Sequence, residues 1–246
     1  MPREPIERHL KTHDNVELFY RHWPHTQSPA RGAVLLFHRG HEHSGRMAHL
    51  VDELNLPNFD FFAWDARGHG RSPGVRGFSP SLGTTVRDIQ TFVEHLNTSH
   101  GVATESIFVI AQSVGAVLVS TWVHDYAPKL RGMTLASPAF KVKLYVPFAR
   151  GGLKLLHRLR GNFFVNSYVK ARFLTHDPER AASYDADPLI ARPISVNILL
   201  RLYDAADRVV ADAQAITVPT QLLISGADWV VQQAPQRTFF DRLGSA

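Results

Sequence analysis

Apolar and polar positions along the chain change pattern repeatedly, and the changes indicate strands separated by helices. Short apolar runs rich in branched residues predict strands, and the run at 32–38, GAVLLFH, is apolar on both faces, as in a central strand. The predicted strands are 16–23, 32–38, 59–64, 107–111, 133–136 and 221–225. Helical spacing of apolar residues predicts helices over 46–54, 82–96, 114–125 and 203–216. This alternation predicts an α/β fold with a mostly parallel central sheet and flanking helices.

The stretch 139–202 breaks the alternation. It holds several short helix-like pieces and no convincing strand, and it separates two strands that would otherwise follow one another. We therefore predict a helical cap or lid over 139–202, inserted into a core built from 1–138 and 203–246. No internal repeat or low-complexity tract suggests a further division.

Composition fits one folded domain of ordinary type. The 246 residues suffice for one large α/β domain, with 44% hydrophobic and 20% charged residues. No apolar stretch approaches the roughly 18 residues of a membrane span, and the N-terminus lacks the apolar region of a secretory signal. The absence of cysteine excludes disulfides, thiolate metal ligands and a cysteine nucleophile. These features favour a cytoplasmic location.

The net charge of +5 is unevenly distributed. Segment 139–176 contains no Asp or Glu, and the rest of the chain has 19 basic and 22 acidic residues. The cations of this basic segment are Lys141, Lys143, Arg150, Lys154, Arg158, Arg160, Lys170 and Arg172. They alternate with apolar residues over 141–174, which suggests contact with an anionic membrane surface; the alternative is a solvated face over a normally packed cap. Such local basicity, without a recognisable stacking module, argues against a nucleic-acid partner.

A strand, a tight turn and a helix follow one another in IFVIAQSVGA, residues 107–116. Ser113 lies at the turn, with the small residues Ala111 and Gly115 two positions before and after it. Small residues are needed there because the turn brings neighbouring backbone close, and the turn exposes the serine hydroxyl at the helix N-terminus. The usual form is Gly-x-Ser-x-Gly, which Ala111 departs from. A match of this kind also arises by chance in turns without catalytic function.

Four further sequence blocks, in a consistent order, are more specific than the serine turn alone. They are FHRGHEHSGR (37–46), WDARGHGRSPG (64–74), YDADPL (184–189) and LLISGADWVV (222–231). Together with the Ser113 turn, they resemble the monoacylglycerol lipase and lysophospholipase group of α/β-hydrolases, of the serine aminopeptidase S33 type. The resemblance extends from about residue 6 to the end of the chain. It implies an α/β-hydrolase fold and hydrolysis of a lipid-like acyl ester through an acyl-enzyme on Ser113, with no metal and no organic cofactor.

The resemblance also assigns a loop that would hold the oxyanion. The backbone N–H groups of Val114 and Gly40 would bind the developing negative charge. His38, Arg39 and Gly115 would support this arrangement, although Arg39 stands where the family usually has glycine and puts the loop's path in question. The alternative role for His38 is that of a histidine capping the end of a strand.

Asp228 follows an apolar strand and a Gly-Ala turn, where the resemblance places the acid that orients the catalytic histidine. An ordinary loop or helix-capping aspartate is the alternative. Asp65, with Arg67 and His69, is expected to tie down a turn at the end of a strand.

The catalytic histidine itself is missing from the expected position. This fold takes it from the loop after the final strand, but only 18 residues follow Asp228 and the last histidine is His176. A helix, a strand and their loops need roughly 25 residues. We therefore expect the C-terminal strand and the general base to be absent and turnover to be low.

Two explanations compete for this absence. One is truncation of a longer product, which could carry a second domain; the other is a protein that has lost catalysis. Truncation is favoured because the serine turn, the oxyanion loop and the acid strand all survive. His41 or His43 offers a further alternative as base, and a non-catalytic binding or interaction domain remains the alternative function.

Overall fold

The computed structural model describes residues 2–143 and 148–245. Positions 144–147, part of the basic segment, lie outside the described residues. No helix among the described residues combines the length and the apolar character that crossing a membrane requires.

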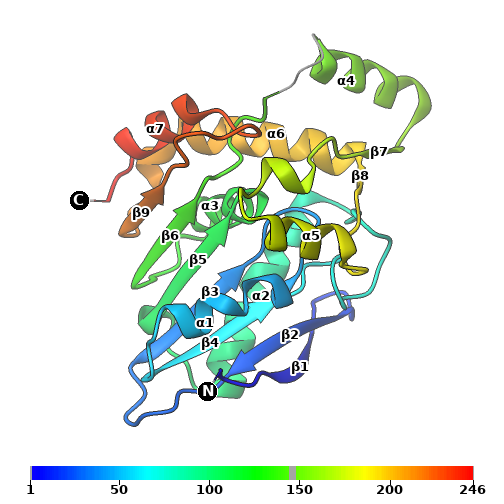
Figure 1. The fold of residues 1–246 in the computed structure, drawn as a ribbon. Coiled ribbons are helices and arrows are strands. Elements are labelled where there is room, and N and C mark those ends of the chain that lie inside the picture. The colour runs from blue at the N-terminus through cyan, green and yellow to red at the C-terminus, as the bar shows by residue number, and fades with distance from the viewer. Residues whose placement is uncertain (1, 144–147, 246) are drawn as a thin grey trace.

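A seven-stranded sheet forms the centre of the molecule (Figure 1). Its strands run in the spatial order β1, β2, β4, β3, β5, β6, β9. β1 and β4 both pair antiparallel to β2, and the remaining neighbours are parallel, which confirms the predicted mostly parallel sheet. The strands are β1 (Ile6–Lys11), β2 (Glu17–Trp23), β3 (Gly32–Phe37), β4 (Phe59–Trp64), β5 (Ile107–Gln112), β6 (Gly132–Ala136) and β9 (Thr220–Leu223).

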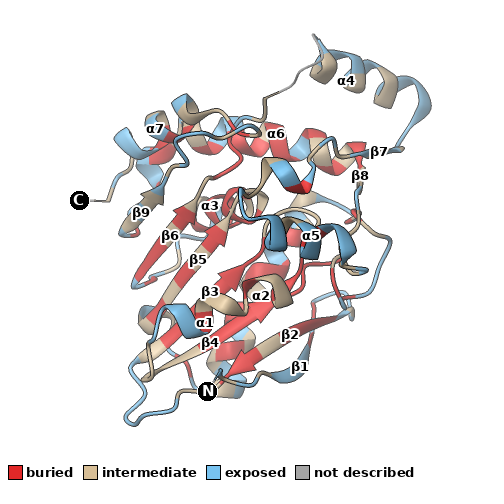
Figure 2. Cartoon of the chain, viewed as in Figure 1, coloured by how far each residue is buried: buried red, intermediate tan, exposed pale blue. Residues whose placement is uncertain are grey.

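Alternation along β3 divides the core between the two faces of the sheet. Leu35 and Phe37 pack into one hydrophobic cluster with α2 (Leu82–His100), α3 (Val114–Tyr126) and α6 (Val196–Ala211). Val34 and Leu36 point to the other face and pack against η1 (Ser44–Met47) and α1 (His49–Glu53). Such a strand must be apolar throughout, because both of its faces are covered. Figure 2 shows the central strands as mostly buried.

The sheet edge at β1 was not predicted. Five of the six residues of IERHLK are exposed, and Leu10 alone is buried. Its sequence carries little apolar signal because the strand contacts the core at one position only. The opposite edge is β9, which is followed by α7 (Gln233–Asp241).

The segment between β6 and α6 differs from the sequence prediction in two respects. It contains two strands, β7 (Phe164–Asn166) and β8 (Pro193–Ser195), which pair antiparallel. Three residues are too few to show a period of two, so the pattern missed them. The other elements of this segment are α4 (Ala149–Arg160), η3 (Ala171–Phe173) and α5 (Pro178–Ala186). The core also contains η2 (Thr104–Ser106), directly before β5.

The second difference concerns the boundary predicted between residues 202 and 203. The single helix α6 crosses it, because its buried face continues without a break from Val196 through Leu202 to Val209. α6 packs against α3 of the core and is followed by η4 (Ala213–Ala215). The predicted cap segment 139–202 therefore includes the beginning of a helix that belongs to the core packing.

Candidate active site

Ser113 joins β5 to α3 in a strained turn. Its backbone has φ 54° and ψ −115°, outside the regions that non-glycine residues ordinarily occupy. Its N–H donates to the carbonyl of Ala136 at 2.9 Å, and its carbonyl accepts from the N–H of Ala139 at 3.2 Å. Hydrogen bonds from the end of the neighbouring strand thus hold the turn in place. Strain of this kind persists where the surroundings impose it, and it concentrates at functional sites.

Glycine at position 115 is required by the same turn. A Cβ atom there would lie 2.4 Å from the carbonyl oxygen of His38 and 2.9 Å from that of Phe37. Both obstacles are backbone atoms, which cannot move aside cheaply. The first turn of α3 therefore packs directly on the end of β3, as the small residue in the sequence motif predicts.

The loop after β3 lies against this turn. A Cβ on Gly40 would be 3.1 Å from Cγ2 of Val114, so Gly40 and Val114 are in close contact. Within the described part of the chain, the N–H of Gly40 has no hydrogen-bond partner. The N–H groups at 40 and 114 are thus placed on adjoining segments, an arrangement suited to receiving a developing oxyanion.

His38 anchors that loop. Its Nδ1–H donates to the carbonyl of Arg39 at 2.8 Å, and its Nε2 accepts from the N–H of Ala66 at 3.1 Å. Burial lowers the pKa of His38, which keeps the ring neutral and able to donate and accept at once. His38 therefore occupies the strand-end position considered as an alternative, and it supports the loop from there.

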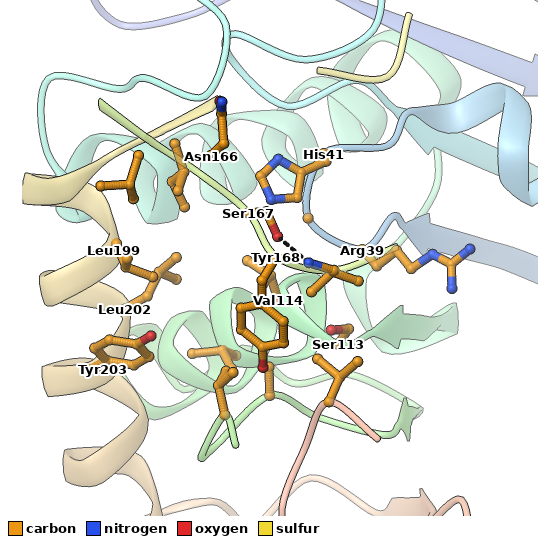
Figure 3. A pocket seen from close by; sticks show the side chains of 18 of the residues that line it. Arg39, His41, Ser113, Val114, Asn166, Ser167, Tyr168, Leu199, Leu202 and Tyr203 are labelled. Carbon is orange, nitrogen blue, oxygen red and sulfur yellow. Dashed lines mark hydrogen bonds between the residues drawn. The ribbon is translucent and has the colours of Figure 1, made fainter. Parts of the chain in front are cut away.

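The loop accommodates Arg39 at the position where the family usually has glycine. Its Nη2 lies 2.6 Å from Oε1 of the buried Glu42, and its guanidinium lies over the ring of Tyr184 from α5. Figure 3 shows the side chain directed away from Val114. The long side chain therefore does not block the approach of Gly40 to the serine turn.

Asp228 lies in the loop after β9. Its Oδ1 accepts hydrogen bonds from the N–H groups of Val230 and Val231, both at 2.7 Å. Helix α7 starts at Gln233 with Gln232 at its N-cap, so Asp228 orders the loop and is not the helix cap. Asp228 and Ser113 line the same cavity of about 250 Å³.

Three histidine positions bear on the question of a general base. His176, in the loop before α5, lines the cavity that Ser113 and Asp228 share, which sequence spacing could not reveal. His41 lines a second cavity beside Ser113, of about 380 Å³. His43 instead binds Oδ2 of Asp187 through Nε2 at 2.9 Å. Within the described residues, no hydrogen bond joins the Ser113 hydroxyl to any of these rings.

Asp65 has the structural role expected of it. Its carboxylate accepts from the N–H of Ser44 at 2.6 Å and from the N–H of Arg71 at 2.7 Å. The residue is fully buried and joins the loops that follow β3 and β4. Its two oxygens are therefore committed to backbone donors.

Two cavities of different character meet at Ser113. The larger, about 380 Å³, is lined mostly by apolar side chains of the core and of the segment between β6 and α6 (Figure 3). The smaller, about 250 Å³, is more polar and includes Arg39, Arg172 and Asp228. The serine hydroxyl is thus placed where an apolar group and a polar group could be bound on either side of one reacting bond.

Comparison with known proteins agrees with this architecture. The family described as serine aminopeptidase S33 matches residues 28–246. The uncharacterized protein YnbC of Escherichia coli is 62% identical over 243 residues, covering 99% of this chain and 42% of that protein. The chain therefore spans less than half the length of this relative. The monoacylglycerol lipase of Mycolicibacterium smegmatis is 29% identical over 237 residues, which are 94% of this chain and 81% of the lipase.

Solved structures agree as well. The crystal structure of Paleococcus ferrophilus monoacylglycerol lipase superposes with a TM-score of 0.79 at 27% identity, covering 98% of this chain and 85% of that one. A soluble variant of the Saccharomyces cerevisiae monoglyceride lipase, solved with a substrate analogue, has a TM-score of 0.83 at 18% identity and shows the shared fold. It covers 100% of this chain and 84% of its own. The chain belongs to the serine aminopeptidase S33 family and is an α/β-hydrolase of the monoglyceride lipase type.

Proposed function

We propose that this chain carries the site of a serine carboxylic-ester hydrolase that acts on a lipid-like acyl ester, of the monoacylglycerol or lysophospholipid class. One observation carries the proposal: the strained turn at Ser113 lies between an apolar and a polar cavity, with Gly40 packed against Val114. The names of the lipase relatives support the same substrate class.

Ser113 Oγ attacks the ester carbonyl, and a base accepts its proton. The carbonyl oxygen becomes an oxyanion that receives hydrogen bonds from the N–H groups of Gly40 and Val114. Collapse of this intermediate expels the alcohol, which takes a proton, and leaves an acyl-serine ester. Water then attacks the acyl group, regenerating Ser113 and releasing the carboxylic acid.

The two cavities bind different parts of the substrate. The acyl chain occupies the 380 Å³ cavity, where its apolar surface leaves water. The alcohol part occupies the 250 Å³ cavity beside Asp228, where polar side chains can hydrogen bond to it. Asp228 orients the histidine that serves as base.

We propose that the 246 residues lack this histidine, because none follows Asp228 in the sequence. His176 borders the cavity that Ser113 and Asp228 share, but within the described residues it makes no hydrogen bond to the Ser113 hydroxyl. Loss of a general base costs about 10²- to 10⁴-fold in rate. A fluorophosphonate probe tests both points: the chain is expected to react at Ser113 at least about a hundredfold more slowly than ordinary serine hydrolases. A Ser113→Ala variant is the control and is expected not to react.

The same assay separates the enzyme from a non-catalytic binding domain. If the gene encodes a strand and a histidine after position 246, a chain extended to include them is expected to react at ordinary rates. Fast labelling of the 246-residue chain would contradict the missing base. Failure of the extended chain to label Ser113 would contradict the hydrolase and favour the binding domain.

We propose further that the residues between β6 and α6 form the cap, since they line the apolar cavity opposite Ser113. The predicted segment 139–202 covers these residues except 137 and 138, and it also includes the start of α6. Val165 of β7, Leu174 after η3 and Tyr184 of α5 all border the cavity. An acyl chain in the cavity would therefore be enclosed by this segment.

A membrane surface is the proposed source of the substrate. Phe148, the N-cap residue of α4, is 93% exposed, and Leu155 and Leu159 of the helix are 61% and 72% exposed. Arg158 of the same helix is exposed as well. Figure 2 shows α4 without buried residues. Part of the basic segment is neutralised, because Arg150 forms ion pairs with carboxylates of α6. Exposed apolar side chains beside an exposed cation suit an anionic lipid surface.

Sedimentation with lipid vesicles tests this contact. Binding is expected to rise when anionic phosphatidylglycerol is added to phosphatidylcholine vesicles and to fall with salt. An Arg158→Glu variant is expected to bind more weakly, and Arg192→Glu, outside α4, serves as the control. Binding that is independent of anionic lipid and salt would contradict the proposal.

A further inference from the structure

The polar cavity beside Ser113 carries more cationic than anionic side chains. Arg39 and Arg172 border this cavity of about 250 Å³, and Asp228 is the one carboxylate among the described residues that line it. A third cation flanks it, because Nζ of Lys143 donates a hydrogen bond to the backbone carbonyl of Asp228. The proposed acyl transfer uses Asp228 but none of these cations. Positive charge in a cavity concentrates anions there, so the arrangement favours an anionic group on the ligand.

Arg172 is available to bind such a group. It belongs to η3, it is exposed, and its guanidinium lies over the ring of Phe173, 5.1 Å from the ring centroid. Within the described residues it forms no ion pair, and segment 139–176 contains no Asp or Glu that could neutralise it locally. Its N–H donors are therefore open to a ligand in the cavity.

Arg39 is held in place and keeps a donor group. Its Nη2 lies 2.6 Å from Oε1 of Glu42, while Nη1 makes no hydrogen bond within the described residues and is not fully buried. The Arg39 side chain is 19% exposed, and Figure 3 shows it directed away from Leu199 and Tyr203 of the apolar cavity. Glycine, which the family usually has at this position, would provide no charge. The cation at position 39 therefore distinguishes this site from the usual oxyanion loop.

Phosphate is the anion that suits two arginines in the space assigned to the alcohol. The planar guanidinium presents paired N–H donors that match the oxygens of a phosphate group. Among the esters of the proposed class, a lysophospholipid carries phosphate on its alcohol part, and a monoacylglycerol carries no charge there. The cations therefore separate two substrates that the apolar cavity alone would treat alike.

We propose that Arg39 and Arg172 bind the phosphate of an acyl ester whose alcohol part is phosphorylated, so that the site prefers lysophospholipids to monoacylglycerols. Hydrolysis of such an ester releases a carboxylic acid and a phosphorylated alcohol. The inference rests on the proposed function, because that function places the alcohol part in this cavity.

Binding to the Ser113→Ala protein tests the preference without requiring turnover. Calorimetric titration compares octanoylglycerol with octanoylglycerol phosphate, which share one acyl chain and are used below the concentrations at which they form micelles. Hydrogen bonds between charged groups are the strong ones, so the phosphate ester is expected to bind at least about 10-fold more tightly. The difference is expected to shrink as salt is added, because the contacts are electrostatic.

Substitutions of the two arginines assign the preference to them. Arg172→Gln removes an exposed charge, and Arg39→Gln combined with Glu42→Gln removes a cation together with its buried partner, so that no unpaired carboxylate remains. Each change is expected to lower the preference about 3- to 5-fold, and all three substitutions together to abolish it. Arg192→Gln, an exposed arginine outside the cavity, is the matched control and should leave the ratio unchanged. The affinity for octanoylglycerol verifies that each variant retains its acyl cavity.

Inorganic phosphate distinguishes recognition of the substrate from a site for the free anion. It is expected to displace octanoylglycerol phosphate only at far higher concentrations, since it lacks the acyl chain. Displacement at equal concentration, equal affinity for the two esters, or a ratio that survives the arginine substitutions overturns the inference and leaves fluorophosphonate labelling of Ser113 unaffected. Absence of binding by both esters overturns it too, and labelling then decides separately whether the hydrolase assignment stands.

Discussion

Nε2 of His43 lies 2.9 Å from Oδ2 of Asp187, and this contact joins the loop after β3 to the segment after α5. Both side chains are largely buried, and Asp187 also accepts from the N–H of Leu189 at 3.0 Å. The loop that contains Gly40 and the segment that encloses the apolar cavity are therefore fastened to each other close to Ser113.

Asp187→Asn is expected to weaken this connection. The substitution removes the charge that accepts from His43 and Leu189, and loss of a buried hydrogen bond to a charged group costs about 1–3 kcal/mol. Urea unfolding should show a lower free energy of unfolding. Asp185→Asn is the matched control, since its ion pair with Arg192 is exposed and should contribute less than about 1 kcal/mol. Equal losses for the two variants would argue against a specific role for Asp187.

Gly115→Ala is expected to disrupt the serine turn. The added Cβ would meet two backbone carbonyl oxygens at 2.4 and 2.9 Å, so α3 must move away from β3. Overpacking of this kind costs about 1–3 kcal/mol or more, and displacement of the Val114 N–H should also slow labelling of Ser113. The measurements are urea unfolding and probe labelling on the same preparation.

The control for that substitution is Gly152→Ala in α4. No atom lies within 4 Å of a Cβ placed there, and the position is helical. Alanine should therefore leave stability unchanged or raise it by up to about 1 kcal/mol. A Gly115→Ala protein as stable as the parent would show that the turn is looser than its geometry implies.

Sequence reasoning succeeded where a local geometric requirement restricts residue type. The turn at Ser113 needs a small residue at 115, and the two-sided burial of β3 needs an apolar run, so both were visible in the chain. The start of α6 was missed because its apolar residues, Val196 and Leu200, pack with apolar residues of the segment before it and so continue that segment's pattern. β1 was missed because only Leu10 is buried.

Proximity between distant segments could not be predicted in the same way. His176 shares a cavity with Ser113 and Asp228 because the segment between β6 and α6 folds back over the sheet, and no spacing in the sequence encodes that approach. The sequence also left open whether the loop can accommodate Arg39. The answer depends on the contacts that the Arg39 side chain makes with Glu42 and with the ring of Tyr184. Such contacts are decided by packing between segments.

Arg67→Lys is expected to destabilise the fold. The Arg67 guanidinium donates to both oxygens of the buried Asp88 and to both oxygens of Asp14, at 2.9–3.0 Å. Lysine keeps the charge but cannot bond both carboxylates in this paired geometry, and each hydrogen bond lost to the buried Asp88 costs about 1.5–3 kcal/mol. Arg71→Lys, an exposed pair with Glu7, is the control.

The stability of the protein is expected to fall as the pH is lowered from about 6.5 to 4. His69 is partly buried, and burial together with the nearby His38 lowers its pKa to about 4. Between these pH values the unfolded chain binds a proton at this residue that the folded chain does not. Stabilisation is therefore complete above pH 6.5 and decreases as the pH falls, by up to about 1.4 kcal/mol per pH unit for this one group.

Urea unfolding at pH 7.5 and 5 measures the slope. Because Nδ1–H of His69 donates to the carbonyl of Arg67 at 3.0 Å, His69→Gln keeps a donor at this position without a titrating group. This variant should show a shallower slope, and an unchanged slope would assign the acid sensitivity to other groups.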